Sequence, residues 1–279
     1  MVDMATPLSS PVRIPDRFSA RSALIAVATA GVLAVGTALV SAPATAAPAP
    51  AAPAASAPAV SSAPASPAPA VSQAPAETGI TEELRSGDSG AQVEALQERL
   101  AELGYWIDGA DGEFGLHTEH AVIALQKAGG LDRDGIVGPA TLEALEDGVV
   151  PSATTSEGAV VEIDLDNQLL LVVSDGEVQQ TIHTSTGSGE PYEGDDGSER
   201  VATTPTGTYD VFREVDAWDP GPYGSLYKPK YFNGGIAVHG YPSVPAEPAS
   251  KGCARVSLAA MDWLWENGHL DIHATVVVH

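Results

Sequence analysis

The sequence predicts a chain of several domains, in which a small bundle of three short helices is followed by a mainly β domain, a sandwich or an open barrel. Two patterns carry this prediction. Apolar side chains recur at helical spacing at Val93, Leu96, Leu100 and Leu103, whereas the later part of the chain has short runs rich in Val and Ile, separated by glycine-rich turns.

Residues 1–46 have the pattern of an export signal. Arginines between positions 13 and 21 precede an uncharged, mainly apolar run over 22–40, and Ala44-Thr45-Ala46 offers a small-x-small cleavage site. The run is also long enough to cross a bilayer, so an uncleaved membrane anchor with its basic end inside the cell is the alternative. In both cases we expect the rest of the protein to lie outside the cytoplasm.

Residues 47–79 are predicted to be a disordered linker, because this stretch is built almost entirely of Ala, Pro and Ser. Such a tract cannot bury a core and behaves as an extended, semi-rigid spacer. The formal net charge of the whole chain is −24. A protein this acidic is repelled by phosphate backbones, which argues against nucleic acid as a partner.

Residues 80–148 contain an internal repeat that defines the helical domain. The pattern D-G-x-x-G-x-x-T-x-x-A occurs at 111–121 and again at 134–144. Each Asp-Gly pair predicts a turn followed by a helix, Gly104 is expected to end the first helix, and Pro139 suits a first helical turn. We interpret His117 and His120 as surface histidines.

The combined spacing in this unit resembles the three-helix peptidoglycan-binding domain found on many wall enzymes. The resemblance covers roughly residues 82–146 and includes the segment from Leu84 to Gly90, Gln97, Gln126 and both Asp-Gly turns. It implies that the domain binds peptidoglycan. A helical linker without a ligand is the alternative, because a fold alone does not establish a function.

After a linker over 149–157, residues 158–279 are predicted to form the β domain. Ser174 to Glu177 supplies a hairpin turn, glycines between 187 and 197 mark a long loop, and Ser257 is expected to cap a short helix that Gly268 ends. The expected strands cover 159–165, 169–173, 178–184, 208–213, 236–239 and 275–278.

Cys253 is the only cysteine of the chain, and it lies between a glycine and an alanine. It therefore cannot form an internal disulfide, and in an exported protein such a thiol is intermolecular, reactive or buried. His239 ends an apolar strand, so the proline-containing loop that follows must bring the imidazole and the thiol together. A metal site built from these two residues and His269, His273 or His279 is a further option, but no recognisable ligand spacing supports it.

The pattern Ile236-x-Val238-His239-Gly240, followed by Ser250-x-Gly252-Cys253-x-Arg255, resembles the catalytic core of L,D-transpeptidases of the YkuD family. Thr204-Pro205-Thr206-Gly207 also fits this family, and the resemblance covers about residues 159–279. It implies a β-rich catalytic fold and cysteine acyl transfer on peptidoglycan stem peptides. No metal or organic cofactor is expected, since a thioester route needs none.

The resemblance also implies roles for individual residues. Cys253 would be the nucleophile, His239 its general base, and the carbonyl of Gly240 would orient the imidazole. Backbone N–H groups around Gly252 and Cys253 would form the oxyanion hole. The expected substrate-binding residues are Ser250, Lys251, Arg255, Tyr227 and Tyr231, although the two tyrosines could equally be packed aromatics and Arg255 a structural ion pair.

One position departs from the family pattern, which usually has His where Lys251 stands. An ammonium group there could favour the thiolate or meet a stem-peptide carboxylate, but it cannot act as an imidazole does near neutral pH.

The export pattern and the two resemblances together imply an exported, wall-associated L,D-transpeptidase that forms 3→3 cross-links, with stem peptides and glycan as partners and carbapenems as inhibitors. An L,D-carboxypeptidase that uses water as acceptor, and a catalytically silent wall-binding protein, are the alternatives.

Overall fold

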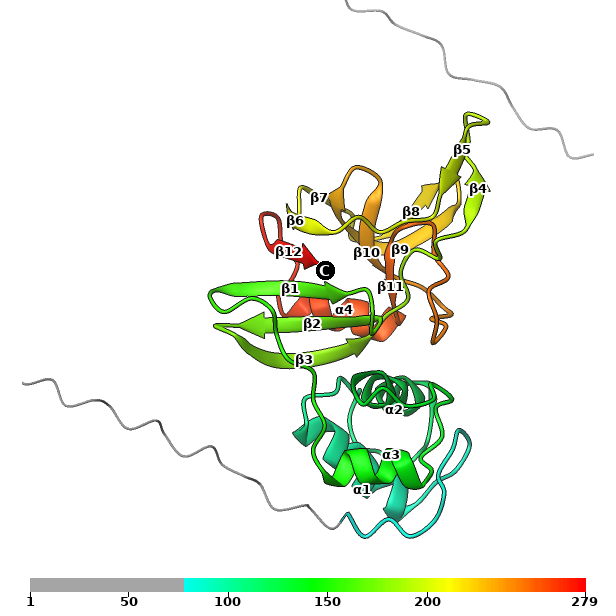
Figure 1. The fold of residues 1–279 in the computed structure, drawn as a ribbon, viewed down its shortest axis with the longest axis vertical. Coiled ribbons are helices and arrows are strands. Elements are labelled where there is room, and N and C mark those ends of the chain that lie inside the picture. The colour runs from blue at the N-terminus through cyan, green and yellow to red at the C-terminus, as the bar shows by residue number, and fades with distance from the viewer. Residues whose placement is uncertain (1–77) are drawn as a thin grey trace, which may run out of the picture. The chain divides into compact units, whose positions relative to one another are not determined.

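The computed structural model describes residues 78–279, which belong to one compact unit. The export signal or anchor predicted over 1–46 lies outside the described residues, as does nearly all of the linker predicted over 47–79. Within 78–279, no helix combines the length and the apolar character needed to cross a membrane. A helical part comes first along the chain and is followed by a part built mainly of strands (Figure 1).

The helical part confirms the predicted bundle of three short helices. Their apolar faces meet in a common core, in which Leu96, Leu100, Val122 and Leu125 are all fully buried. Gly104 adopts a φ of 79° just beyond the first helix, the left-handed conformation that glycine allows at a helix end. The helices are α1 (Ala91–Glu102), α2 (Leu116–Ala128) and α3 (Pro139–Glu146).

The sequence repeat is a repeat of structure. The side-chain amide of Gln97 donates to Asp111 at 2.8 Å and accepts from the N–H of Gly112 at 2.8 Å. In the second copy, Gln126 donates to Asp134 at 2.7 Å and accepts from the N–H of Gly135 at 2.9 Å. Each buried glutamine thus satisfies the polar groups of one Asp-Gly turn, which explains why the two turns share one pattern.

The first sheet has the strand order β3-β2-β1-β12-β6. The parallel pair is β1 with β12, and the other neighbours are antiparallel. The turn between β2 and β3 has positive φ at Asp175 (49°) and Gly176 (85°), as a tight two-residue hairpin requires. The strands are β1 (Ala159–Asp164), β2 (Leu169–Ser174), β3 (Glu177–His183), β6 (Gly207–Asp210) and β12 (Thr275–Val278).

The second sheet has the order β11-β10-β9-β7, with β8 paired to β9. Its strands are β7 (Arg213–Glu214), β8 (Trp218–Gly221), β9 (Gly224–Asn233), β10 (Ile236–Gly240) and β11 (Ala254–Val256). A separate hairpin consists of β4 (Pro191–Glu193) and β5 (Glu199–Val201). The helix α4 (Leu258–Glu266) is capped by Ser257, whose side chain accepts from the N–H of Ala260 at 3.1 Å.

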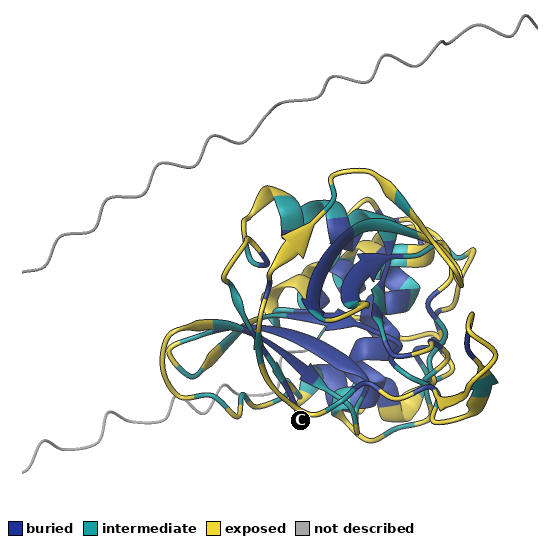
Figure 2. Cartoon of the chain, turned by 90° about the horizontal axis from the view of Figure 1, so that it is seen from above, coloured by how far each residue is buried: buried dark blue, intermediate teal, exposed yellow. Residues whose placement is uncertain are grey.

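The core of the β part combines both sheets with α4. Val238, Ala254, Met261 and Val276 are fully buried in one cluster, although they come from four different elements. Figure 2 shows this interior as the dark blue strands and helices, whereas the connecting turns are yellow. The predicted mainly β architecture is therefore confirmed.

Two predicted segments differ from the structure. The strand expected over 208–213 is split between the two sheets, because Val211 and Phe212 interrupt it and Arg213 pairs with β9 instead. The long loop expected over 187–197 contains β4 and most of the turn into β5. The sequence showed no sustained alternation in either place.

The prediction that His120 is a surface histidine is wrong. Only 7% of His120 is exposed, and its ring packs edge-on against His183 of β3 with centroids 4.8 Å apart. His117 is half-buried beside Trp106. The sequence repeat alone does not show which face of α2 packs against the strands.

Candidate active site

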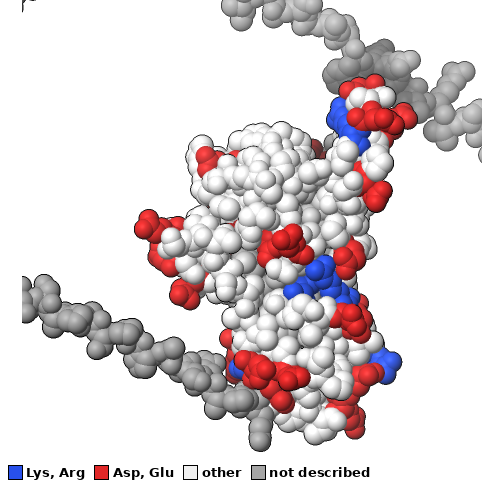
Figure 3. Space-filling model, in the orientation of Figure 1, with Lys and Arg blue, Asp and Glu red and all other residues white. Residues whose placement is uncertain are grey.

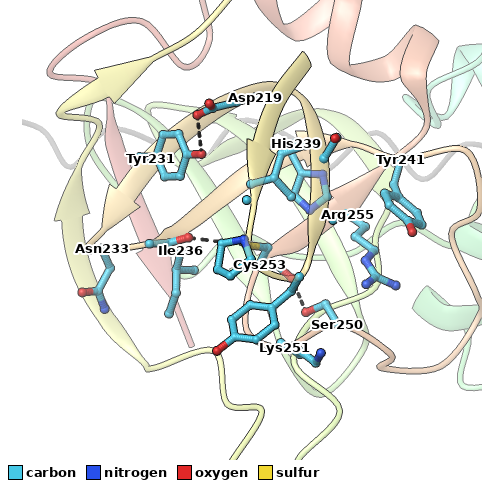
Figure 4. Close-up of a pocket in the computed structure, with 18 of the residues that line it drawn as sticks. Asp219, Tyr231, Asn233, Ile236, His239, Tyr241, Ser250, Lys251, Cys253 and Arg255 are labelled. Atoms are coloured by element: carbon cyan, nitrogen blue, oxygen red, sulfur yellow. Dashed lines mark hydrogen bonds between the residues drawn. The ribbon is translucent and has the colours of Figure 1, made fainter. Parts of the chain in front are cut away.

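Cys253 and His239 are placed by two adjacent parallel strands. His239 belongs to β10, Cys253 directly precedes β11, and the register pairs His239 with Arg255. Val238 and Ala254 are fully buried and point into the core. Because side chains alternate along a strand, their neighbours His239, Cys253 and Arg255 lie on the opposite face of the sheet. Figure 4 shows the thiol, the imidazole and the guanidinium of Arg255 around one cavity.

This cavity has a volume of about 770 Å³. Its walls come from the segment around Cys253, the β8–β9 and β9–β10 hairpins, and the β4–β5 hairpin. The structure brings most of the predicted site residues together here, namely Tyr231, His239, Ser250, Lys251, Cys253 and Arg255. Parts of the chain far apart in sequence thus contribute to one concave site, as is usual for a small-ligand site.

The imidazole of His239 is held in one tautomer. Its Nδ1 lies 2.9 Å from the carbonyl oxygen of Gly240. A carbonyl can only accept, so the proton resides on Nδ1 and Nε2 keeps a free lone pair. Burial lowers the pKa of His239 to about 4, the Gly240 hydrogen bond opposes this in part, and the positive charge of Arg255 adds a smaller lowering effect. The ring is therefore neutral at pH 7 and can take up a proton at Nε2.

The thiol of Cys253 is also neutral at rest. Burial raises the pKa of Cys253, while Arg255 and a backbone hydrogen bond act in the opposite direction. The Sγ atom lies 3.8 Å from the carbonyl oxygen of Gly235. A raised thiol pKa beside a lowered imidazole pKa disfavours a resting thiolate–imidazolium pair. The site is suited to proton transfer that accompanies nucleophilic attack.

The side chain of Ser250 braces the turn that carries the thiol. Its hydroxyl donates to the carbonyl of Cys253 at 2.6 Å and accepts from the N–H of Gly252 at 3.0 Å. The resemblance implied an oxyanion hole formed by N–H groups around Gly252 and Cys253. The N–H of Gly252 is not free for this role, because it is already bonded to Ser250. A serine three residues before a cysteine can close this turn locally, which the sequence did not reveal.

Thr203 and Thr204 support the same turn from another part of the chain. The hydroxyl of Thr204 donates to the carbonyl of Gly252 at 2.7 Å. Gly252 has a φ of 131°, and a Cβ added there would come within 2.8 Å of the Thr203 carbonyl oxygen, so only glycine fits. In the sequence, Thr204 was noticed only as the first residue of the family motif Thr204-Pro205-Thr206-Gly207. The motif did not show that its side chain bonds to the turn at Gly252.

Two cations of the cavity have no carboxylate partner. Arg200 and Arg213 form ion pairs with neighbouring aspartates. Within residues 78–279 neither Lys251 nor Arg255 forms a salt bridge, and both rest on aromatic rings. The amine of Lys251 lies 4.3 Å from the ring centre of Tyr223, and the guanidinium carbon of Arg255 lies 4.5 Å from that of Tyr241. Nε of Arg255 is buried, and no atom of the described part of the chain forms a hydrogen bond with it. The pocket therefore presents unneutralised positive charge beside the thiol.

The two tyrosines predicted near the site have different environments. Tyr231 lines the cavity, donates to Asp219 at 2.8 Å and carries Arg213 over its ring. Tyr227 lies behind the site, where its hydroxyl donates to Asp262 of α4 at 3.0 Å and its ring packs against Gly240. Tyr227 is thus a packed aromatic and not part of the cavity wall.

The residues weighed for a metal site do not form one. Among the described residues, His, Cys, Asp and Glu side chains nowhere gather in groups of three or more that could hold a metal ion. His279 lies 3.3 Å from Glu162, and His269 stacks on Trp263 with ring centres 4.8 Å apart.

Two family models match the chain. The model of a peptidoglycan-binding domain matches residues 89–145, and that of the L,D-transpeptidase catalytic domain, YkuD, matches residues 158–278. Over 64 residues the chain is 48% identical to a probable N-acetylmuramoyl-L-alanine amidase of Bacillus licheniformis. The matched segment covers 22% of this chain and 18% of the amidase. The amidase CwlL of the same organism is 52% identical over 64 residues, with the same coverage. The chain thus spans less than a fifth of either amidase.

A solved structure is similar over both parts of the chain. It is the crystal structure of an L,D-transpeptidase from Xylanimonas cellulosilytica, which is 48% identical, with a TM-score of 0.69. The similarity covers 72% of this chain and 98% of that one. With the matches of both domain models, this similarity shows that the chain belongs to the L,D-transpeptidase (YkuD) family and carries a peptidoglycan-binding domain in addition.

Proposed function

We propose that this chain is an exported L,D-transpeptidase that forms 3→3 cross-links in peptidoglycan through a thioester on Cys253. The observation that carries the proposal is the placement of Cys253 beside a His239 whose Nδ1 is fixed by Gly240, in one cavity. Such a cysteine and histidine arrangement, oriented by a third group, is the basis of acyl transfer. The peptidoglycan-binding domain would keep the enzyme on its polymeric substrate.

In the acylation step, Cys253 attacks the carbonyl of the third residue of a tetrapeptide stem. The thiol proton moves to Nε2 of His239 as the S–C bond forms. The tetrahedral intermediate collapses, the peptide bond to the terminal D-Ala breaks, and the imidazolium returns its proton to the departing amine. His239 can perform both transfers because it is neutral at rest and accepts only one proton.

In the second step, the side-chain amine of another stem attacks the thioester. His239 takes a proton from that amine, a new amide bond forms, and the thiolate leaves and is protonated again. The amine must reach the thioester before water does, so the cavity must favour the acceptor stem over solvent.

Lys251 and Arg255 are proposed to bind carboxylates of the stem peptides. Stems are anionic, and these two cations flank the nucleophile without carboxylate partners of their own in residues 78–279. Arg255 offers a planar donor fork suited to a carboxylate, whereas Lys251 offers a point charge.

An L,D-carboxypeptidase reaction remains the second candidate, because the same acyl-enzyme yields a tripeptide if water attacks it. The separating experiment is incubation of purified enzyme with tetrapeptide muropeptides, with and without an acceptor stem. Mass spectrometry should find Cys253 heavier by the acyl group, and cross-linked dimers only with an acceptor present. Tripeptide as the main product in both samples would assign the carboxypeptidase.

The matched control is Cys253→Ala, which should form neither adduct nor product. We also expect carbapenems to acylate the same thiol, since their strained ring presents an electrophilic carbonyl. If the wild-type protein gave no adduct with stem or carbapenem, the chain would be a silent wall-binding protein.

A further inference from the structure

Lys127, at the end of α2, is a buried cation that the transpeptidase chemistry does not use. Its side chain is 1% exposed, although lysine is rarely buried without a partner. Among the described residues, its hydrogen-bond partners all lie in the β part of the chain. Its Nζ donates to the carbonyl of Gln168 at 2.9 Å and to that of Thr184 at 2.8 Å, and it lies 2.8 Å from Nδ1 of His183. No carboxylate is among these partners.

The contacts of Lys127 continue through His183 into the loop that joins His239 to Cys253. Nε2 of His183 lies 2.9 Å from the carbonyl oxygen of Val244, a buried residue of that loop. A neutral pair of lysine and histidine has three hydrogens for these four contacts, whereas the singly protonated pair has four. Each contact is therefore satisfied only when the pair carries one positive charge.

A buried cation without an acid lowers stability compared with an apolar residue, but a fully satisfied polar network fixes one arrangement. Burial lowers the pKa of Lys127 to about 6 and that of His183 well below its ordinary value, so burial opposes the positive charge that the four hydrogen bonds favour. The main effect of the hydrogen bonds around Lys127 is therefore to fix the positions of the groups that they join, and not to raise the stability of the fold.

Thr184, whose carbonyl accepts from Lys127, and its neighbour Ser185 also form hydrogen bonds with the backbone that flanks Cys253. The hydroxyl of Thr184 donates to the carbonyl of Arg255 at 2.7 Å, and Ser185 exchanges backbone hydrogen bonds with Arg255 at 3.0 and 3.2 Å. The hydroxyl of Ser185 donates to the carbonyl of Glu247 in the same loop at 2.8 Å. The end of β3 thus links the Lys127 site to the backbone on both sides of Cys253.

The helical part is joined to the strands by more than this site. The N–H of Trp106 donates to the carbonyl of Thr181 at 2.9 Å, and the N–H of Thr181 donates to the carbonyl of Gly104 at 2.8 Å. Leu169 and Leu171 of β2 share one core cluster with the helices. A freely tethered binding module would show neither feature, so Lys127 acts from a fixed position.

We propose that Lys127, a residue of the peptidoglycan-binding domain, is a positioning residue of the transpeptidase active site. Through His183 and Thr184 it holds the loop between His239 and Cys253, so that the wall-binding domain completes the catalytic scaffold. The kinetic part of this inference rests on the proposed transpeptidase function.

The test compares Lys127→Met and Lys127→Gln with Arg133→Gln. Arg133 forms an exposed pair with Glu247 of the same loop at 3.2 Å, so it controls for the loss of a surface contact between the same two parts. Each variant is first checked for folding by near-UV circular dichroism. Amide hydrogen exchange over 241–253, the alkylation rate of Cys253 by iodoacetamide, and kcat and KM for acylation by a tetrapeptide stem are then measured.

We expect faster exchange over 241–253 in both Lys127 variants, with α1 and β1 unchanged, and a kcat lower by about tenfold or more, because a displaced nucleophile loses its alignment. KM should stay within about twofold, since the wall of the cavity that binds substrate is intact. Arg133→Gln leaves the hydrogen bonds of Lys127 in place, so it should change the exchange rate over 241–253 and kcat much less than either Lys127 variant does.

Folded Lys127 variants with wild-type exchange, alkylation and kcat would overturn the inference. If Lys127→Met does not fold, the polar Lys127→Gln decides by the same criteria. If the wild-type enzyme itself forms no acyl-enzyme, the proposed function fails, whereas exchange and alkylation still decide the role of Lys127.

Discussion

At the scale of single residues, the proposed nucleophile Cys253 and the proposed base His239 have opposite pKa displacements. The buried His239 has a pKa lowered to about 4, and burial raises the pKa of Cys253. A base must be neutral to accept a proton, so a lowered pKa keeps His239 active at lower pH. We expect the acid limb of the acylation rate near pH 4, well below the 6.5 of an ordinary histidine.

The variant Arg255→Gln tests the contribution of the neighbouring positive charge to these two pKa values, which is smaller than that of burial. The charge of Arg255 lowers the pKa of both His239 and Cys253, so its removal should raise both and move the acid limb to higher pH. Alkylation of Cys253 across the pH range needs no substrate that Arg255 would bind, and because the thiolate is the reacting form, its rising limb reports the pKa of Cys253 and should also move to higher pH. An unchanged limb would contradict this assignment.

Gly240 has a steric role beside its carbonyl. A Cβ at this position would lie 2.7 Å from Cδ1 of Tyr227 and 3.2 Å from side-chain atoms of Leu258 and Met261. We expect Gly240→Ala to lower the free energy of unfolding by about 1–3 kcal/mol through overpacking, and to lower activity because the displaced carbonyl no longer fixes His239. Urea unfolding and acylation rates measure the two effects.

Gly235→Ala is the control for stability in this experiment, because a Cβ there meets nothing within 4 Å. Its free energy of unfolding should change by no more than about 0.5 kcal/mol. Equal losses in both variants would show that the contact with Tyr227 is unimportant.

At the scale of elements, Lys251 joins two hairpins at the mouth of the cavity. Its amine lies 5.3 Å from the ring centre of Tyr192 in β4 and 4.3 Å from that of Tyr223 in the β8–β9 turn. The two rings meet edge-on with centres 5.4 Å apart. An exposed cation–π contact contributes only about 0.5–1 kcal/mol. This is little for the stability of the fold, but it is enough to favour one position of a hairpin over another.

We therefore expect Lys251→Met to raise KM for the stem and to speed proteolysis within 191–201, with little change in the melting temperature. Lys251→Arg, which keeps the charge over the rings, should restore protection from proteolysis. If Lys251→Met digests like wild type, the hairpins do not depend on this contact.

Strands with an alternating or apolar pattern in their own sequence could be predicted. Strands that form because they pair with distant segments could not. The strands at 159–165, 169–173 and 275–278 alternate or are continuously apolar, and the structure has β1, β2 and β12 there. The longest strand, β9, was missed because Gly224–Asn233 contains Pro229 and two lysines, one of which, Lys230, is fully buried on Glu214 and Trp265. Its strand character comes from pairing with β7, β8 and β10.

The candidate site divides in the same way. His239, Gly240, Cys253 and Arg255 were recognisable from a motif with fixed spacing, and the structure brings them together. The bond between Ser250 and Gly252 and the burial of Lys127 depend on how the backbone turns and on which helix packs against β3. Spacing along the chain carries no information on such contacts.

At the scale of the whole molecule, the acidic surface and the buried histidines oppose each other as pH falls. The formal net charge is −24, and Figure 3 shows acidic side chains on both the helical and the strand part of the visible face. Protonation of carboxylates relieves their mutual repulsion, which favours the folded state. Buried histidines act in the other direction, because the unfolded chain binds protons that the folded chain excludes.

His120 allows this histidine contribution to be isolated. Burial lowers the pKa of His120 to about 4, with smaller contributions from His117 and Lys127. The pKa of an unfolded histidine is about 6.5, so the stability that a neutral His120 contributes is present above pH 6.5 and is lost as the pH falls from about 6.5 to 4, at up to about 1.4 kcal/mol per pH unit.

The variant His120→Gln removes the titration and keeps a polar side chain. Its free energy of unfolding, measured in urea between about pH 7.5 and 4.5, should fall less steeply with acid than that of wild type, whatever the cost of the substitution at neutral pH. The surface charge is unchanged at neutral pH, so the repulsion between carboxylates cancels in the comparison. Parallel curves would mean that the unfolded and folded states bind equal numbers of protons at His120, which would require its ring to reach solvent in the folded protein.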